Sequence, residues 1–184
     1  GGRGYKAPNE AEPLRIISSH PMPDYPESCQ QGITVRLCQH RLGINPGLAG
    51  IKHLNRLEQV LARSEWEDDN IREGLMLDIN NKLVEGTMTN LFMVHNGHLI
   101  TPAIDENGIE GVMRAEVIKL AGRLEIPVTE TALTLTDLKQ ADEIFLTNSI
   151  IEIWPVAHVL DTDLHWPHGT LTRRLQSELK QAER

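Results

Sequence analysis

The sequence has little of what marks several large classes of protein. Aromatic residues make up 4% of its 184 residues, too few to expect a platform of rings that stacks single-stranded nucleic acid. Its 18 basic residues are outnumbered by 26 acidic ones, and the net charge of −8 argues against binding a phosphate backbone, which requires a basic face. No apolar run approaches the roughly 18 residues of a membrane-spanning helix. We therefore expect neither a nucleic-acid partner nor a membrane.

Cysteine and metal-binding patterns are also scarce. Cys29 and Cys38 are too few for a disulfide framework, so we expect a reducing, cytoplasmic location. The eight histidines contain no His-Glu-x-x-His pair and no other zinc spacing. The chain contains no P-loop and no Gly-x-Ser-x-Gly elbow. These absences exclude the common metal, nucleotide and serine-hydrolase motifs, and we predict no metal site.

The size and polarity of the chain fit one globular domain. It is 40% hydrophobic and 24% charged, as is usual for a soluble protein of this length. It opens on the sequence GGRGY without an initiator methionine and continues through a proline-rich stretch. We therefore expect the C-terminal part of a longer protein, with residues 1–13 as a linker and residues 14–184 as the folded domain.

Hairpins dominate the middle of the chain. Residues 75–79 and 82–85 flank an Asn-Asn turn, and residues 90–95 and 98–101 flank an Asn-Gly turn, the strongest short hairpin signal. Apolar patterning predicts further elements: strands at 14–19, 33–37, 126–131, 143–147 and 156–160, and helices at 53–65, 111–124, 136–141 and 170–180. This order predicts a mixed α/β (α+β) fold with helices outside the sheet.

Lys52 stands out among the lysines because of its neighbours. It lies between a loop rich in glycine and proline and the predicted 53–65 helix, whose apolar face contains Leu54, Leu57, Val60 and Leu61. A cation at a helix N-terminus is disfavoured by about 0.3–1 kcal/mol. Such a position favours the neutral amine that forms a Schiff base. The alternative is a surface lysine that only lays its stem along the protein.

Three further segments carry polar groups suited to a cofactor. Glu85 ends a predicted strand, where a carboxylate is either solvated or available to the ring nitrogen of pyridoxal phosphate. Gly111 opens a predicted helix, whose first N–H groups can hold an anion. Residues 147–149, Thr-Asn-Ser, end another strand with small polar donors. Each of these alone is also what an ordinary cap or turn contains.

Taken in this order, the segments resemble the fold-type IV pyridoxal phosphate enzymes. The run AGIKHLNRLE at 49–58 is similar to the lysine loop of the aminodeoxychorismate lyases. Glu85 followed by NLF at 90–92 resembles the family's glutamate motif, and GVMR at 111–114 and TNS at 147–149 resemble its two phosphate segments. GGRGY at 1–5 is similar to the segment where the small and large domains of the lyases meet. The resemblance covers essentially the whole chain.

The resemblance implies a fold, a cofactor and a reaction. The fold would be the large C-terminal domain of such an enzyme, a pseudo-barrel of hairpin-rich sheets in a homodimer, with the small N-terminal domain missing from this chain. Lys52 would hold pyridoxal 5'-phosphate covalently and then take the C4 proton of the substrate, and Glu85 would face the ring nitrogen. The phosphate would be held by Gly111, Val112, Met113, Asn148 and Ser149. The reaction would convert 4-amino-4-deoxychorismate to 4-aminobenzoate and pyruvate, a step toward folate.

Two alternatives stay open on the residues alone. A branched-chain or D-amino acid aminotransferase of the same fold would use Lys52 and Glu85 in the same way. The branched-chain enzymes usually carry a tyrosine shortly after the lysine, where this chain has Asn-Arg-Leu at 55–57, and this difference favours the lyase. The second alternative is a catalytically inert fragment that serves as a folded or oligomerising domain. The arginine that the small domain of the family supplies to the cofactor phosphate cannot be assigned here.

Overall fold

Eight strands form one sheet in the computed structural model, which describes residues 4–7 and 9–182 of the chain. In chain order the strands are β1 (Ile33–Leu42), β2 (Ile71–Asp78), β3 (Leu83–Gly86), β4 (Asn90–His95), β5 (His98–Pro102), β6 (Val128–Thr131), β7 (Glu143–Asn148) and β8 (Glu152–Val159). The helices of the same described residues are η1 (Glu27–Gln30, a 3-10 turn), α1 (Leu57–Arg63), α2 (Val112–Arg123), α3 (Leu135–Leu138) and α4 (Thr170–Ala182).

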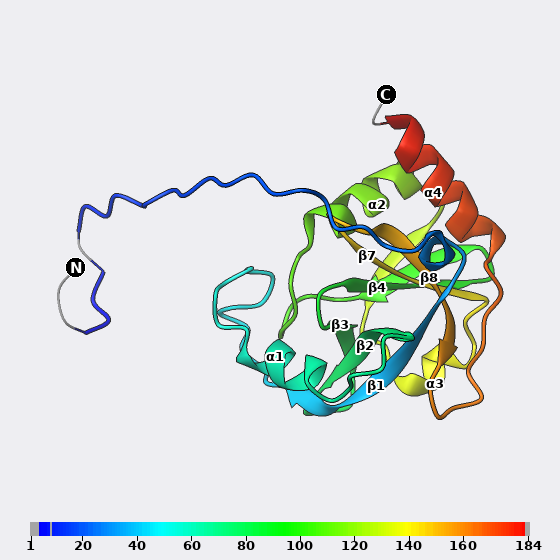
Figure 1. The fold of residues 1–184 in the computed structure, drawn as a ribbon, viewed down its shortest axis with the longest axis horizontal. Helices are drawn as coiled ribbons and strands as arrows, with labels where there is room; N and C mark the ends of the chain where they lie inside the picture. The colour runs from blue at the N-terminus through cyan, green and yellow to red at the C-terminus, as the bar shows by residue number, and fades with distance from the viewer. Residues whose placement is uncertain (1–3, 8, 183–184) are drawn as a thin grey trace.

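The sheet closes on itself. Hydrogen bonds join the strands in the order β3-β2-β1-β8-β7-β4, and β4 returns to β3 through a pair between Glu85 and Asn90. β5 and β6 continue the sheet from β4 outside this ring. In Figure 1, α2 and α4 lie side by side at one end of the ring and α1 lies at the other. The mixed α/β class and the barrel of hairpins with outer helices are therefore confirmed.

Both predicted hairpin turns are present. Asn96 and Gly97 have φ values of 51° and 76°, which is the left-handed conformation that the tight turn between β4 and β5 requires. Asn81, with φ 60°, supplies the same conformation between β2 and β3. The helices predicted from Gly111 and from Thr170 are present as α2 and α4.

Side chains along β4 alternate between two buried clusters. Leu91 and Met93 pack with residues of β1, β2, β7 and β8. Phe92 and Val94 point the other way and pack with residues of α2 and α4. The ring of Phe92 stacks on that of Phe145 at a centroid distance of 5.0 Å. Because successive side chains of a strand point to opposite faces, one face of β4 fills the ring and the other carries the helices.

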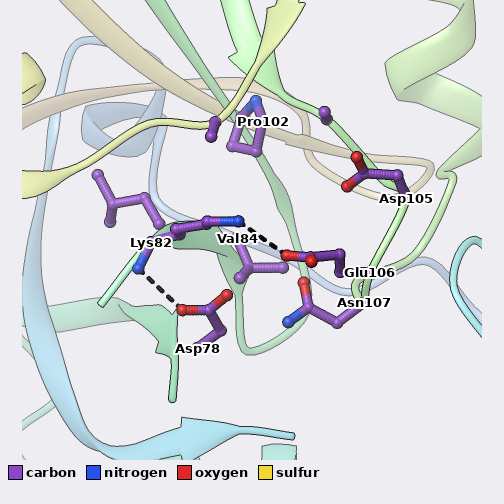
Figure 2. Close-up of a pocket in the computed structure, with 10 residues that line it drawn as sticks. Asp78, Lys82, Val84, Pro102, Asp105, Glu106 and Asn107 are labelled. Carbon is purple, nitrogen blue, oxygen red and sulfur yellow. Dashed lines mark hydrogen bonds and ion pairs between the residues drawn. The ribbon is translucent and has the colours of Figure 1, made fainter. Parts of the chain in front are cut away.

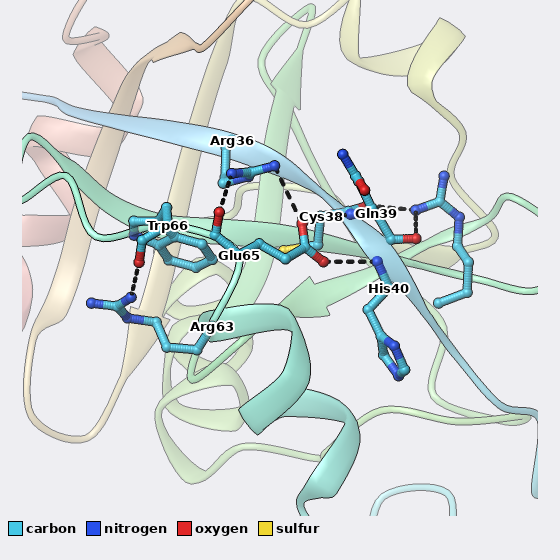
Figure 3. Close-up of polar contacts among 8 residues, drawn as sticks. Arg36, Cys38, Gln39, His40, Arg63, Glu65 and Trp66 are labelled. Carbon is cyan, nitrogen blue, oxygen red and sulfur yellow. Dashed lines mark hydrogen bonds and ion pairs between the residues drawn. The ribbon is translucent and has the colours of Figure 1, made fainter.

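A carboxylate anchors the end of α1 to the sheet (Figure 3). The pairing of β1 with β2 changes register between Leu37 and Arg41, and Glu65 accepts hydrogen bonds from the backbone N–H groups of Gln39 and His40 there, both at 2.8 Å. Arg36 donates to the backbone oxygen of Glu65 at 2.8 Å and also pairs with its carboxylate. These contacts fix α1 against β1.

Two predicted elements differ from the structure. The strand predicted at 14–19 is wrong, because Leu14, Ile16 and Ile17 are 84–95% exposed and no strand is formed there. A strand needs a neighbouring backbone to supply its hydrogen bonds, and a local pattern cannot reveal whether one is near. The predicted 53–65 helix is shorter, since α1 starts only at Leu57.

The predicted apolar face of α1 is also wrong. Leu54 is fully exposed and Leu57 is 67% exposed, whereas Gln59 and Ala62 are the buried residues of α1. The loop from residue 51 to residue 56 is folded by short turns instead, with hydrogen bonds such as that from the N–H of His53 to the carbonyl of Ile51. The buried side of α1 therefore carries a glutamine and an alanine in place of the expected leucines.

The N-terminal segment runs away from the body of the molecule (Figure 1). Of the linker expected at 1–13, residues 1–3 and 8 lie outside the described residues, and the others are exposed. Among the described residues, no helix is long and apolar enough to cross a membrane. In that same part of the chain, no cluster of three or more His, Cys, Asp or Glu side chains could hold a metal ion.

Candidate active site

Five stretches of chain surround a cavity of about 750 Å³. They are the loop before α1 with α1 itself, part of β2, the β3–β4 turn, the start of α2, and the end of β7. A cavity of this size suits a cofactor or a small-molecule substrate. It is lined by all seven residues that the sequence predicts for the site: Lys52, Glu85, Gly111, Val112, Met113, Asn148 and Ser149.

Glu85 is a buried acid at the edge of the cavity. It is 3% exposed, and its carboxylate accepts hydrogen bonds from the N–H of Ile109 at 2.8 Å and from the amide nitrogen of Gln59 at 3.3 Å. Burial raises the pKa of Glu85 to about 7, although these two hydrogen bonds and the charges of Arg56 and Lys52 oppose the rise. Its protonation therefore changes near neutral pH, and a protonated nitrogen beside it would favour the ionised form.

Lys52 reaches the cavity from a loop rather than from a helix. It is exposed, and because α1 starts five residues later, the expected position at a helix N-terminus is wrong. The preceding Gly50 is held by backbone hydrogen bonds to Gly108 at 3.0 Å and from Glu110 at 3.1 Å. Gly50 has a φ of +79°, which a residue with a side chain rarely adopts. The position of Lys52 is thus set by the backbone hydrogen bonds that join Gly50 to the distant loop at residues 108–110.

The loop that receives Gly50 links several parts of the site. Its residue Ile109 binds Glu85, and its residue Glu106 forms an ion pair with Lys82 at 2.8 Å (Figure 2). The backbone N–H of Lys82 also donates to Asp78, which ties the loop to the β2–β3 turn. The loop then leads directly into α2. The segment from residue 103 to residue 111 therefore fixes the lysine loop, Glu85 and the start of α2 relative to one another.

The start of α2 presents backbone donors to the cavity. Gly111 is the N-cap of α2 in an extended conformation, and the first N–H groups of a helix have no partner within it. A Cβ on Gly111 would collide with the side chain of Asn90, so glycine is required for this approach. The next residues, Val112 and Met113, line the cavity. This helix start can hold an anion.

Asn148 builds the opposite turn with its side chain. Its Oδ1 accepts hydrogen bonds from the N–H groups of Ile150 at 2.8 Å and Ile151 at 2.9 Å, and its Nδ2 donates to the carbonyl of Met88 at 3.1 Å. The amide is therefore already occupied by these contacts. Ser149, next in the chain, lines the cavity and carries the hydroxyl.

Comparison with known proteins identifies the family of this chain. A family model described as amino-transferase class IV matches residues 1–159. The chain belongs to this family. It is 38% identical over 182 residues to the aminodeoxychorismate lyase of Vibrio harveyi, covering 97% of this chain and 67% of that protein.

Solved structures of class IV proteins are also similar to this chain. The crystal structure of 4-amino-4-deoxychorismate lyase from Pseudomonas aeruginosa superposes with a TM-score of 0.93 and 48% identity, covering 98% of this chain and 67% of that one. The branched-chain aminotransferase of Thermobaculum terrenum, in its pyridoxal phosphate form, gives a TM-score of 0.75 and 29% identity, covering 87% and 54%. The chain thus spans about two thirds of the lyases and about half of that aminotransferase.

The class IV family implies pyridoxal phosphate as cofactor, and the side chains of the cavity fit it. An amine, a buried acid that titrates near neutrality and a helix start for a phosphate line one space. The side-chain oxygen of Gln59 is buried and, among the described residues, has no hydrogen-bond partner. It lies beside Glu85, to which the amide nitrogen of the same residue donates. Together these groups suit a charged aromatic cofactor that carries an anionic group at one end.

Several residues that line the cavity were not predicted from the sequence. Arg56, Gln59 and Arg63 lie in the segment that the pattern assigned to a helix with an apolar inner face, so they were expected to face solvent. Arg72 and Glu73 lie on β2, where charged residues are usually solvated. The signal that could have revealed Arg72 and Glu73 is the presence of charged residues in a strand that is otherwise apolar. Three arginines and Lys52 thus line the cavity, together with the acids Glu73, Glu85 and Glu110.

Proposed function

We propose that this chain is the cofactor-binding part of a lyase that converts 4-amino-4-deoxychorismate to 4-aminobenzoate and pyruvate. The observation that carries the proposal is that all seven expected residues line one cavity. The TM-score of 0.93 with a lyase of this name supports the reaction type, compared with 0.75 for the aminotransferase. The exposed Lys52 and the buried Glu85 are the two groups on which the chemistry depends.

Each residue has a role that follows from its position. Bound in the cavity, pyridoxal phosphate would supply a ring that withdraws electrons from C4 of the substrate. The amine of Lys52 would hold the aldehyde carbon of the cofactor, and we assign to the same amine the removal of the C4 proton. Glu85 keeps a proton on the ring nitrogen. The N–H groups at the start of α2 and the donors of Ser149 would hold the phosphate, while Asn148 shapes the turn that carries Ser149.

The basic residues of the cavity support an anionic substrate. Arg56, Arg63 and Arg72 line the same space as Lys52, and clustered positive charge attracts and orients carboxylates. We further propose that residues on a smaller N-terminal domain complete the site, since the chain spans 67% of the lyase from Vibrio harveyi. The buried, unpaired Cys29 and Cys38 suit the reducing cytoplasm, in which we place the reaction.

We also propose that the subunits form a homodimer. Leu54, Leu57 and Val60 expose 58–101% of their surface on the loop and helix that line the cavity. Neighbouring exposed apolar side chains on one element favour a protein interface. Sedimentation of the chain should give a dimer, and Leu57→Glu should shift it to monomer while leaving the fold intact. A monomer before the substitution would contradict the proposal.

Measuring the products tests the proposed reaction. The chain, and a longer chain with upstream residues, are loaded with pyridoxal phosphate and given 4-amino-4-deoxychorismate without an α-keto acid. We expect equal amounts of pyruvate and 4-aminobenzoate, with tighter cofactor binding by the longer chain. Amine transfer that depends on an added α-keto acid would instead identify an aminotransferase. No product and no visible absorbance from bound cofactor with either chain would identify an inert domain.

A further inference from the structure

Glu73 is a buried carboxylate to which the proposed chemistry gives no role. It lies on β2, is 1% exposed, and borders the cavity. Its two oxygens accept five hydrogen bonds: at Oε1 from the N–H of Gly74 (2.8 Å), the N–H of Thr87 (3.1 Å) and the hydroxyl of Thr87 (2.5 Å), and at Oε2 from the N–H of Met88 (3.1 Å) and the hydroxyl of Thr89 (3.0 Å).

The β3–β4 turn surrounds this carboxylate in the way that a binding site surrounds an anion. The successive N–H groups of Thr87 and Met88 point at it, which is the arrangement of an anion-binding nest. No lysine or arginine of the described residues lies within ion-pair distance of it. Burial raises the pKa of Glu73, and the backbone and hydroxyl donors, four of which come from the turn, oppose that rise. A charged acceptor makes such hydrogen bonds stronger than a neutral one does.

The same turn connects the two ends of the proposed site. It begins directly after Glu85, and the carbonyl of Met88 accepts the hydrogen bond from the Asn148 side chain at 3.1 Å. The N–H of Gly86 donates to the carbonyl of Thr89 at 2.7 Å, which closes the turn. A Cβ at Gly86 would collide with Thr89 and lie 2.9 Å from the Glu73 carboxylate, so the packing here leaves no space. A shift of the turn must therefore move Glu85, Asn148 or both.

We propose that Glu73 is a positioning residue of the cofactor site, holding the β3–β4 turn so that Glu85 and Asn148 keep their places at the two ends of the cavity. This inference rests on the proposed function. Glu73 acts through the turn and is assigned no contact with cofactor or substrate. Without two accepting oxygens at residue 73 the turn keeps only part of these hydrogen bonds, and the cavity loses the fixed separation between its ring end and its phosphate end.

A second buried carboxylate provides a matched control. Glu143 is 8% exposed and accepts hydrogen bonds from the N–H of Leu171 at 3.0 Å and from the N–H and hydroxyl of Thr172 at 2.8 Å and 2.6 Å. It therefore serves the start of α4 much as Glu73 serves the β3–β4 turn. It does not line the cavity. A purely structural carboxylate and a positioning one can thus be compared within one chain.

The experiment compares Glu73→Gln with Glu143→Gln. An amide cannot accept at both ends, so at least one backbone N–H beside residue 73 loses its partner. Hydrogen–deuterium exchange of the unloaded protein should become at least tenfold faster at Thr87 and Met88 in Glu73→Gln and stay unchanged there in Glu143→Gln. Titration with pyridoxal phosphate should give an affinity about tenfold weaker for Glu73→Gln, whereas Glu143→Gln stays within twofold of the unsubstituted chain. Both variants should lower the melting temperature.

Two outcomes would overturn the inference. One is equal loss of affinity in both variants, which would make Glu73 a general stabilising residue. The other is unchanged exchange and affinity in Glu73→Gln. If Glu73→Gln does not fold, Thr89→Val removes one donor and keeps the carboxylate, and it should weaken binding two- to fivefold with faster exchange in the turn. If the unsubstituted chain, alone and with upstream residues, binds no pyridoxal phosphate, the proposed function fails, while the exchange data still decide whether Glu73 holds the turn.

Discussion

The cavity has two sides that are built differently. On the sheet side, Glu85 and Glu73 are 3% and 1% exposed and held by backbone N–H groups. On the loop side, Lys52 is exposed, and the neighbouring Leu54 touches little of the described chain. The acids that we propose to control charge therefore lie on buried, hydrogen-bonded strands, and the amine that we propose to move a proton lies on a loop held by a few backbone contacts. Rigid support suits a fixed charge, and a looser loop suits a group that must move.

The largest expected effect concerns the loop side. Lys52→Ala should abolish turnover, because no other amine can hold the cofactor's aldehyde in its place. Since the side chain is exposed, the free energy of unfolding should change by no more than about 0.5 kcal/mol. Borohydride reduction of the loaded chain followed by peptide mapping should find the label on Lys52. A label on Lys82 or Lys119 would contradict the assignment of Lys52 as the lysine that holds the cofactor.

The next effect concerns the charge on the sheet side. Glu85→Gln should slow turnover on the order of a hundredfold, because a neutral amide does not keep the ring nitrogen protonated. Glu85→Asp should lose less turnover than Glu85→Gln, since aspartate keeps the carboxylate charge. Steady-state kinetics of the three proteins would check this order. Turnover of Glu85→Gln close to that of the unsubstituted chain would make Glu85 an ordinary strand-end carboxylate.

The buried acid also predicts how stability depends on pH in the absence of cofactor. Burial raises the pKa of Glu85 from an ordinary value of 4.5 to about 7 in the folded protein, so the folded state holds its proton more tightly than the unfolded state. The free energy of unfolding should therefore fall as pH rises from 4.5 through 7, by about 3 kcal/mol. Urea unfolding at several pH values measures this. Glu85→Gln should make the decline shallower, and an equal decline in that variant would refute the assignment.

The smallest effects test the loop that joins the two sides. Gly108 has a φ of +83°, and an added Cβ would lie 2.9 Å from the side chain of Val84, so Gly108→Ala should destabilise the protein by about 1–2 kcal/mol. It should also weaken cofactor binding, because Ile109 next to it donates to Glu85. Lys82→Ala removes an exposed ion pair with Glu106 and should change little. Thermal unfolding and cofactor titration of both variants would show whether backbone pairing or the ion pair holds the loop.

Sequence patterns predicted the sheet side well. Period-two alternation and the Asn-Gly turn act over a few residues, and β3, β4 and β5 are found where these signals put them. The pattern failed at residues 14–19 and at the start of α1. There, an apolar run predicts burial, whereas Leu14 and Leu54 are exposed. A local pattern shows which residues suit an element, but not whether a partner lies beside them.

By itself the sequence determined the hairpins, the outer helices and seven of the residues that line the cavity. Only the tertiary structure decided that Glu73 holds a turn of the site, that Gln59 rather than a leucine faces inward, and that the loop around Ile109 joins the lysine loop to Glu85. These relations depend on hydrogen bonds between residues 14 to 60 positions apart. Such bonds form only once the ring of strands has closed, because closure is what brings distant backbone donors to a buried carboxylate.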